Sequence, residues 1–358
     1  MVLERYPQPA RFGMQPGDVC DRPLRAAIGK YGKADQRSAE KINRNSSDKP
    51  ELLPKNGQPE ERRAEMSLQV NDRMLFPQGK RKAFTLSYDD GITQDRRLVE
   101  LFNQYHVKAT FNLNPGLFGR KGTVAAGKKE VPHVKVDAQE AAVLYKGHET
   151  AAHGQYHECL TGMDTARCVE EILESRKALE ILYKKTVTGY AYAFGAYDEV
   201  VIKALEASGI TYARTIDSTH KFDIPENFLT WNPTCHHDDD KIWDLAEAFL
   251  SDRMYFNLLT PAKLFYVWGH SYEFDQNDNW GHIENFIENI AGHEDVWYAS
   301  NGEIREYVQS YRRLVFSVDG KTVYNPSSVC VCLGGTFTKD FVEVPAGQTA
   351  ILIPPVEM

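Results

Sequence analysis

The sequence predicts an α/β fold in which a mainly parallel sheet, open or closed into a barrel, is followed by a small antiparallel β extension. Two observations support this prediction. From residue 82 to about residue 307, strand-like and helix-like segments alternate, which is typical of repeated β-α units. From about residue 310, short apolar runs are separated by turn residues instead. The chain has 358 residues, enough for one large domain with attachments or for two domains.

The repeating region contains four apolar runs that predict buried strands and five segments with the apolar spacing of helices. The expected strands cover residues 83–88, 109–113, 189–193 and 264–268, and the expected helices cover residues 95–105, 137–146, 165–182, 198–208 and 279–290. Asp137 and Asp164 are expected as N-caps, because an Asp side chain accepts hydrogen bonds from the free N–H groups of a first turn. Gly209 is expected to end the fourth helix. In a parallel sheet of this kind, the active site lies at the C-terminal ends of the strands.

The C-terminal part predicts a hairpin in which residues 314–318 and 321–324 flank an Asp319-Gly320 turn. Further strands are expected over residues 329–333, 341–344 and 349–353. We interpret residues 309–358 as an extension that covers an edge of the main domain, expected over residues 66–308. A carbohydrate-binding module is the less favoured interpretation, because about 45 residues form only a small sheet.

Residues 1–65 differ in composition from the rest of the chain. They are rich in Arg, Lys, Asn, Pro, Gln and Glu and show little apolar periodicity, so they predict a disordered tail. An alternative hypothesis is that the natural chain starts at Met66, because folded character begins abruptly at Leu68.

Composition and charge limit the classes of function. Charged residues make up 26% of the chain and apolar residues 42%, which is ordinary for a soluble globular protein. The net charge of −8 argues against nucleic acid as a partner, because phosphate binding needs a basic surface. No apolar run of about 18 residues predicts a membrane span, and the N-terminus lacks the apolar core of a signal peptide. The six cysteines form no C-x-x-C pair, so we expect reduced thiols and a cytoplasmic protein.

Two short segments carry the chemistry. Residues 87–91 read Ser-Tyr-Asp-Asp-Gly after an apolar run, and residues 153–157 place two histidines four positions apart. Together they offer one Asp and two His to a metal, with a second Asp beside it. Three protein ligands and an open position are how a catalytic metal site is built. The second carboxylate is then placed to take a proton from water.

These segments resemble the motifs of the polysaccharide deacetylases of the NodB-homology type, carbohydrate esterase family four. Residues 87–91 match the first family motif, and residues 147–157, which begin Gly-His-Glu and end with the histidine pair, match the second. Residues 190–195 and 268–270 lie where the third motif and the Leu-x-His motif fall. The resemblance covers roughly residues 83–275 and implies a distorted (β/α) barrel.

The resemblance also implies a role for each residue of the site. Asp90, His153 and His157 would bind the metal. Asp89 would act as the general base, and His270 as the general acid that protonates the leaving amine. The implied cofactor is a divalent metal, zinc first, although cobalt, nickel, iron or manganese also suit these ligands.

The chain departs from the family pattern in the third motif. Ala191 and Ala193 stand where members usually carry an Arg and a Pro, and that Arg holds the catalytic Asp in place. Arg214, on the next expected strand, is our candidate for the missing partner of Asp89. The alternative is that Arg214 pairs with a surface carboxylate.

Further residues are expected to surround the substrate. The candidate substrate-binding residues are Phe194, Gly195, Tyr197, His236, His237, Tyr272 and Trp280. The resemblance assigns the backbone N–H of Phe194 to the oxyanion. Three interpretations of residues 235–240 stay open: they line the substrate site, they cap the helix that begins near Lys241, or they form a second metal site. His148 is expected to be structural.

These observations lead to an expected function. We expect a metal-dependent hydrolase that removes N-acetyl, or O-acetyl, groups from a carbohydrate. A soluble oligosaccharide is the expected substrate, because polymeric cell-wall substrates lie outside the cytoplasm. One alternative is a hydrolase of a non-sugar amide, such as a cyclic ureide. Another is a carbohydrate-binding protein without catalysis. Neither nucleic acid nor a membrane is expected as a partner.

Overall fold

The computed structural model describes residues 73–125, 129–251, 262–334 and 341–352. The expected tail over residues 1–65, and the hypothesis about Met66, lie outside the described residues.

The largest sheet contains β2 (Lys82–Asp89), β3 (Ala109–Leu113), β6 (Glu149–Ala152), β7 (Gly189–Ala191), β8 (Tyr212–Arg214), β9 (Cys235–His236), β10 (Lys263–Gly269) and β11 (Val296–Tyr298). The helices are α2 (Asp95–Gln104), α3 (Ala138–Leu144), α4 (Thr165–Tyr183), α5 (Glu199–Ala207), α6 (Ile242–Leu250), α7 (Tyr272–Asn277), α8 (Trp280–Ile290) and α9 (Asn301–Arg312). Short 3-10 turns are η1 (Pro77–Gly79), η2 (Pro115–Leu117), η3 (Ala193–Gly195) and η4 (Phe228–Thr230).

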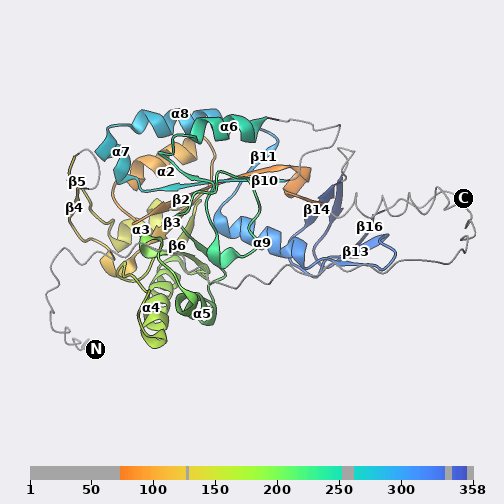
Figure 1. Cartoon of the computed structure of the whole chain (residues 1–358), viewed down its shortest axis with the longest axis horizontal. Coiled ribbons are helices and arrows are strands. Elements are labelled where there is room, and N and C mark those ends of the chain that lie inside the picture. Colours follow the sequence, from red (N-terminus) through yellow and green to blue (C-terminus); the bar gives the residue numbers. More distant parts are fainter. Residues whose placement is uncertain (1–72, 126–128, 252–261, 335–340, 353–358) are drawn as a thin grey trace, which may run out of the picture. The chain divides into compact units, whose positions relative to one another are not determined.

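The strands of the large sheet are parallel and follow the order β8-β7-β6-β3-β2-β10-β9. β11 pairs with the first half of β2, on the edge that β3 leaves open. Because helices connect successive strands, both faces are covered. In Figure 1, α2, α6 and α8 lie on one side of the strands, and α4 and α5 lie on the other.

One irregular segment connects the two ends of this strand order. The Trp231 N–H donates to the Ala213 carbonyl of β8, and the Trp231 carbonyl accepts from the Thr215 N–H just after β8. Three residues later, the Thr234 N–H donates to the Tyr266 carbonyl of β10. The sheet therefore closes on itself through residues 231–236. This arrangement confirms the predicted distorted barrel with a small antiparallel extension.

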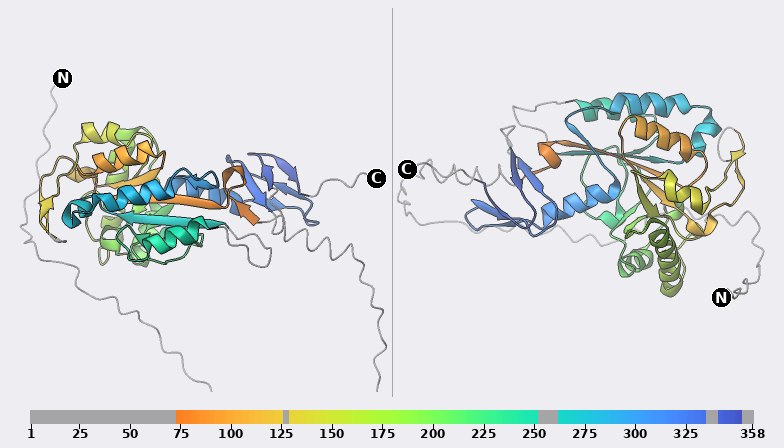
Figure 2. Two further views of the ribbon diagram at one scale, coloured as in Figure 1. Left: turned by 90° about the horizontal axis from the view of Figure 1, so that it is seen from above. Right: turned by 180° about the vertical axis from the view of Figure 1, so that it is seen from behind.

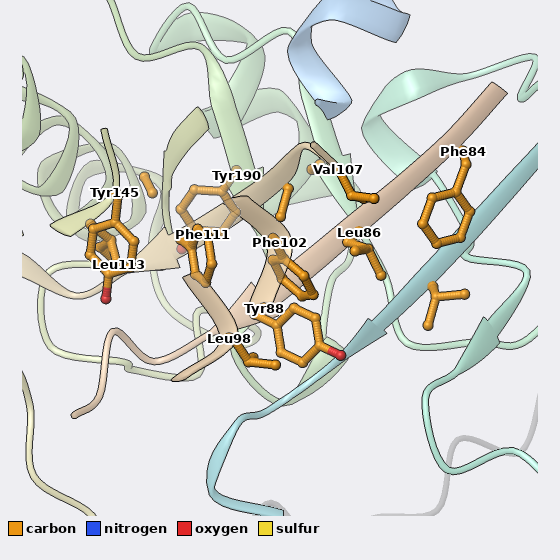
Figure 3. Packing of buried hydrophobic residues seen from close by; sticks show 14 of the residues in the cluster. Phe84, Leu86, Tyr88, Leu98, Phe102, Val107, Phe111, Leu113, Tyr145 and Tyr190 are labelled. Carbon is orange, nitrogen blue, oxygen red and sulfur yellow. The ribbon is translucent and has the colours of Figure 1, made fainter. Parts of the chain in front are cut away.

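The core is built from the apolar faces that the sequence pattern predicted. Phe84, Leu86 and Tyr88 of β2 are fully buried, and Figure 3 shows Tyr88 near Phe102 of α2 and Phe111 of β3, with Phe84 further along the strand. Each such side chain stabilises the fold by about 1.5–3 kcal/mol relative to an exposed position. The central strand is buried along its whole length, which fixes the position of the residues at its end.

The predicted helix ends are confirmed. Asp137 and Asp164 accept hydrogen bonds from the N–H groups of Glu140 and Arg167 at the starts of α3 and α4. Gly209 follows α5 with a φ of +72°, a conformation that glycine adopts without steric cost. Among the described residues, no helix combines the length and apolar character needed to cross a bilayer.

The remaining strands form three small antiparallel sheets. They are β1 (Arg73–Leu75) with β14 (Val331–Gly334) and β15 (Phe341–Val344), β12 (Val315–Phe316) with β13 (Thr322–Tyr324) and β16 (Thr349–Ile351), and β4 (Thr123–Val124) with β5 (Val131–Pro132). The predicted hairpin around Asp319-Gly320 is the β12–β13 pair. In both views of Figure 2, the strands of the C-terminal extension lie at the opposite end of the ribbon from β4 and β5.

The C-terminal extension shares a core with the barrel. Tyr307 of α9 donates its hydroxyl to the Leu75 carbonyl at 2.5 Å and accepts from the Cys332 N–H at 2.9 Å. Met74, Leu333 and Ile304 belong to the same buried cluster. Residues 73–75, far from the extension in sequence, therefore complete one of its sheets.

Candidate functional site

The polar residues of the predicted site lie at the C-terminal ends of strands, as expected. Asp89 ends β2 and Asp90 follows it, His153 follows β6, Arg214 ends β8, and His270 follows β10. Parallel strands bring these ends to one rim of the barrel.

Asp90, His153 and His157 form a group whose ligand atoms all lie within 4.8 Å of one another. Asp90 and His157 have left-handed φ angles of 82° and 60°. Such backbone costs of order 1–3 kcal/mol per residue and persists where the surrounding structure imposes it. The three sequence-predicted metal ligands are thus brought together, two of them on strained backbone.

The donor atoms of this group suit a divalent metal. His153 donates its Nδ1–H to the Ala191 carbonyl at 2.8 Å, and its Nε2 is buried without a hydrogen-bond partner. Burial lowers the pKa of His153, and burial together with His153 lowers the pKa of His157 to about 3, so both rings are neutral. Burial opposes the charge on Asp90, but the His133 hydrogen bond and Lys135 hold its pKa well below the usual range. Neutral imidazoles and an ionised carboxylate are the forms that bind metal.

Two further residues contact Asp90 and were missed by sequence reasoning. His133 Nε2 lies 3.2 Å from Asp90 Oδ2, and the Lys135 ammonium donates to Asp90 Oδ1 at 2.8 Å and to the Asp90 carbonyl at 2.7 Å. Lys135 is almost fully buried. The available signal was the alternation of apolar and polar residues over 131–136, which puts both side chains on one face of an extended segment.

Asp89 is held by Arg214 and Asn112. The Arg214 guanidinium donates to Asp89 Oδ2, and the Asn112 amide donates to Oδ1 at 2.8 Å. The guanidinium also lies over the Trp268 ring, 4.4 Å from its centroid. Burial disfavours the Asp89 charge, but Arg214 and then His153 and His270 lower the pKa of the carboxyl overall. The candidate replacement for the missing motif-three Arg therefore contacts the carboxylate it was expected to hold.

His270 lies on the other side of Asp89, with its Nε2 3.9 Å from Asp89 Oδ2. Its Nδ1 lies 3.3 Å from Glu273 Oε1, three residues further along. Burial alone would lower the pKa of His270, but the hydrogen bond and charge of Glu273 raise it to about 9. His270 is thus a cation at neutral pH. Sequence reasoning missed this pairing, although the i, i+3 spacing of His270 and Glu273 was visible.

Glu273 also contacts the two histidines that follow Cys235. Its Oε2 lies 3.1 Å from His236 Nε2 and 3.2 Å from His237 Nε2. Burial opposes the Glu273 charge, but the hydrogen bonds from these rings and from His270 lower the pKa of Glu273 strongly. His236 and His237 therefore hold one oxygen of the Glu273 carboxylate, while its other oxygen lies next to His270.

Residues 77–213 match the family model described as polysaccharide deacetylase. This chain contains a polysaccharide deacetylase domain. The matched range includes Asp89, Asp90 and the histidine pair, and it ends one residue before Arg214. The deacetylase match therefore covers the metal-ligand motifs, whereas Arg214 and His270 lie outside the matched range.

Several solved structures are similar to the deacetylase domain at low sequence identity. A candidate polysaccharide deacetylase from Mycobacterium smegmatis is 18% identical, with a TM-score of 0.47, and the match covers 67% of this chain and 94% of that one. A family 4 carbohydrate esterase from Streptomyces lividans is 14% identical, with a TM-score of 0.39, over 62% of this chain and 93% of that one. A family 4 pseudoenzyme from Bacillus anthracis is 15% identical, with a TM-score of 0.38, over 65% and 68%. No curated protein sequence matches significantly.

A cavity of about 370 Å³ opens beside the metal-ligand group of the deacetylase domain. Its lining includes Asp90, His157 and Tyr272. Phe194 borders the site from η3. Its ring is 62% exposed and lies 4.6 Å from the His157 ring, on backbone with a φ of 59°. Gly195 follows it at a φ of +68°, where an added Cβ would collide with Ile216.

Four expected substrate-binding residues are not among those that line this cavity, and they have other contacts. His237 is fully buried, with its ring stacked on Phe274, and His236 packs on Trp268. Both support Glu273 instead of lining the cavity.

The other two of these residues, Tyr197 and Trp280, are aromatic and pack in the domain. Tyr197 stacks on buried Tyr192, with ring centroids 4.9 Å apart. Trp280 donates to Asp275 at 2.8 Å, and Arg97 lies 4.4 Å from its ring centroid. Neither residue is part of the lining of the cavity.

The contacts of residues 235–240 bear on the three interpretations left open for them, and those of His148 on its expected structural role. Asp239 accepts from the Lys241 N–H at 3.0 Å just before α6, but no side chain of the described residues caps the first-turn N–H groups of this helix. His236 and His270, with Glu273, form a second group of potential ligands among the described residues. His148 accepts from the Ala109 N–H through Nδ1 and packs on Phe111, which is a structural role.

Proposed function

We propose that this chain is a metal-dependent hydrolase that removes N-acetyl, or O-acetyl, groups from a carbohydrate. One observation carries the proposal: three groups of different chemistry surround a single carboxylate oxygen. Asp89 Oδ2 contacts Arg214 and lies 3.8 Å from His153 Nε2 and 3.9 Å from His270 Nε2. The proposed base, Asp89, thus lies beside a proposed metal ligand, His153, and the proposed acid, His270, at the rim of the barrel.

The protonation states support general acid–base chemistry at this point. In the proposed reaction, ionised Asp89 takes a proton from the attacking water, and protonated His270 gives its proton to the leaving nitrogen or oxygen. The two groups keep opposite charges because Arg214 stabilises the carboxylate and Glu273 stabilises the imidazolium. Pairs of groups whose surroundings separate their pKa values are typical of acid–base sites.

The metal ligands proposed are Asp90, His153 and His157. A divalent cation held there, zinc first among the metals that suit these donors, would supply a Lewis acid that polarises the acyl carbonyl and lowers the pKa of water. We further propose that the Phe194 backbone N–H donates to the developing oxyanion, since its residue lies directly beside His157.

The proposed substrate is a soluble acetylated oligosaccharide in the cytoplasm. The cavity of about 370 Å³ lies at the lower end of the range for small-ligand pockets, which supports recognition through few sugar units. Its wall contains Tyr156 and Tyr272, whose rings offer apolar faces to a pyranose.

The test is acetate release from chitobiose by the metal-reconstituted protein, before and after removal of the metal with EDTA. We expect release that requires the metal and that falls by about 10²-fold or more in Asp89→Asn. Asp244→Asn, which changes an exposed carboxylate on α6, is the matched control and should be unaffected. Turnover of cyclic ureides alone would contradict the carbohydrate substrate. If the folded, metal-loaded protein turned over neither class, the proposal of catalysis would be wrong.

A further inference from the structure

Residues 120–124 and 131–135 form a two-stranded ribbon at the edge of the cavity. The His133 N–H donates to the Gly122 carbonyl and the Lys135 N–H to the Arg120 carbonyl, in the same register as the β4–β5 pair. Arg120 therefore lies opposite Lys135, and Gly122 lies opposite His133. Residues directly opposite in an antiparallel pair project from the same face.

That face of the ribbon is directed at the proposed metal ligands. The His133 and Lys135 side chains both contact the Asp90 carboxylate. Arg120, at the position opposite Lys135, is part of the lining of the same cavity. Gly122 carries no side chain, so the space between Arg120 and His133 stays open. Arg120 and Asp90 thus line the same cavity.

The charges on this face are not balanced. Lys135 has the Asp90 carboxylate as its partner at 2.8 Å. No carboxylate of the described ranges lies within ion-pair distance of the Arg120 guanidinium, and its residue is exposed. Like charges in opposite positions of a strand pair are destabilising, so two cations here cost free energy unless anions compensate both. One of the two lacks a compensating anion.

We propose that Arg120 binds an anionic substituent, a carboxylate or a phosphate, on the sugar that enters the cavity. This inference rests on the proposed deacetylase function and specifies its substrate class. A guanidinium offers a planar pair of N–H donors that matches carboxylate and phosphate oxygens. The substrate is then an acidic acetylated sugar, with its anion on the Arg120 side of the cavity and its acyl group on the Asp90 side.

Binding measurements test the proposal without depending on turnover. Titration calorimetry compares chitobiose with two analogues that carry a carboxylate or a phosphate at C6, using metal-free and metal-loaded protein. We expect at least one anionic sugar to bind about 10-fold tighter or more than chitobiose, since a charge-assisted hydrogen bond contributes about 1.5–3 kcal/mol. Arg120→Gln should remove this difference, and Arg120→Lys should keep part of it.

Lys121→Gln is the matched control. Lys121 is the next residue in sequence, is exposed, and projects from the opposite face of the ribbon, so it should leave the preference unchanged. The two analogues separate a carboxylate from a phosphate as the bound group. Equal binding of neutral and anionic sugars, or a preference that survives Arg120→Gln, would overturn the inference.

Kinetics distinguish a failure of this inference from a failure of the proposed function. Acetate release from chitobiose with the same kcat/KM as from the anionic analogues would leave the function standing and refute the role of Arg120. Tight, Arg120-dependent binding of an anionic sugar without acetate release would support the anion site and contradict deacetylation.

Discussion

The Arg214 guanidinium reaches the Asp89 carboxylate from a strand four positions away in the sheet. Arg214 ends β8 and Asp89 ends β2, with β7, β6 and β3 between them. The contact exists because residues 231–236 bond to both β8 and β10, so the sheet curves until its ends meet. Both side chains are almost completely buried. Each therefore depends on the other to offset the cost of a buried charge.

Replacing Arg214 tests whether it orients the proposed base. We expect Arg214→Met to lower kcat by about 10²-fold or more, because Asp89 loses the cation that positions it. Metal content should not change, since Arg214 is not in the ligand group. Arg214→Lys should restore part of kcat. Thermal unfolding must accompany the kinetics, because breaking a buried ion pair costs about 3–5 kcal/mol. Unchanged kcat in a folded Arg214→Met protein would refute the role.

The pH profile of kcat/KM tests the acid role of His270. The pKa of His270 is raised to about 9, so the imidazolium is present below that pH and is lost above it. Activity should therefore fall as the pH rises through about 9. Glu273→Gln should move this alkaline limb to lower pH, because the carboxylate that raises the pKa is gone. Asp275→Asn, two residues further along α7, should leave the limb in place. A limb that does not move in Glu273→Gln would show that another group controls it.

Thermal unfolding with added zinc tests the metal ligands. A ligand that binds only the folded state raises Tm in proportion to the logarithm of its concentration. We expect zinc to raise the Tm of the wild type but not of His153→Gln, which lacks the unpartnered Nε2. His148→Gln changes a nearby histidine outside the ligand group and should retain the zinc response. A full response in His153→Gln would argue against this metal site.

Asp95 should make the fold less stable as the pH rises. It is buried at the start of α2, where it accepts from Ser271 at 2.5 Å and from Tyr145 at 2.8 Å. Burial outweighs these hydrogen bonds and raises the pKa of Asp95 to about 7. Between about pH 4 and 7, the unfolded state releases this proton while the folded state keeps it, so unfolding becomes easier.

Urea unfolding from pH 4.5 to 8 measures this effect. Asp95→Asn removes this titrating group. The free energy of unfolding of the variant should therefore rise relative to that of the wild type as the pH rises, by up to about 4 kcal/mol. Asp244→Asn serves as the control, with a difference from the wild type that stays constant across this range. A constant difference for Asp95→Asn as well would mean that Asp95 is ionised in the folded protein at acidic pH.

Local features of the fold were predictable because they depend on neighbours in sequence. Asp164 caps α4, and Gly209 follows α5, since caps and turns involve only residues a few positions apart. The apolar run before Asp89 identified a buried strand for the same reason. The contacts of Glu273 with His236 and of Trp280 with Arg97 were not predictable. Each joins residues that are far apart in the chain and come together only when the helices pack.

The sequence by itself determined the chemical inventory of this protein: two adjacent carboxylates after a buried strand, a histidine pair at i, i+4, and alternating strands and helices that bring such residues to one rim. Only the tertiary structure decided that Arg214 meets Asp89, that Lys135 and His133 hold Asp90, and that His237 is buried away from the cavity. The physical reason is the closure of the sheet. Strand order and curvature set which side chains converge, and both arise from contacts between residues far apart in the chain.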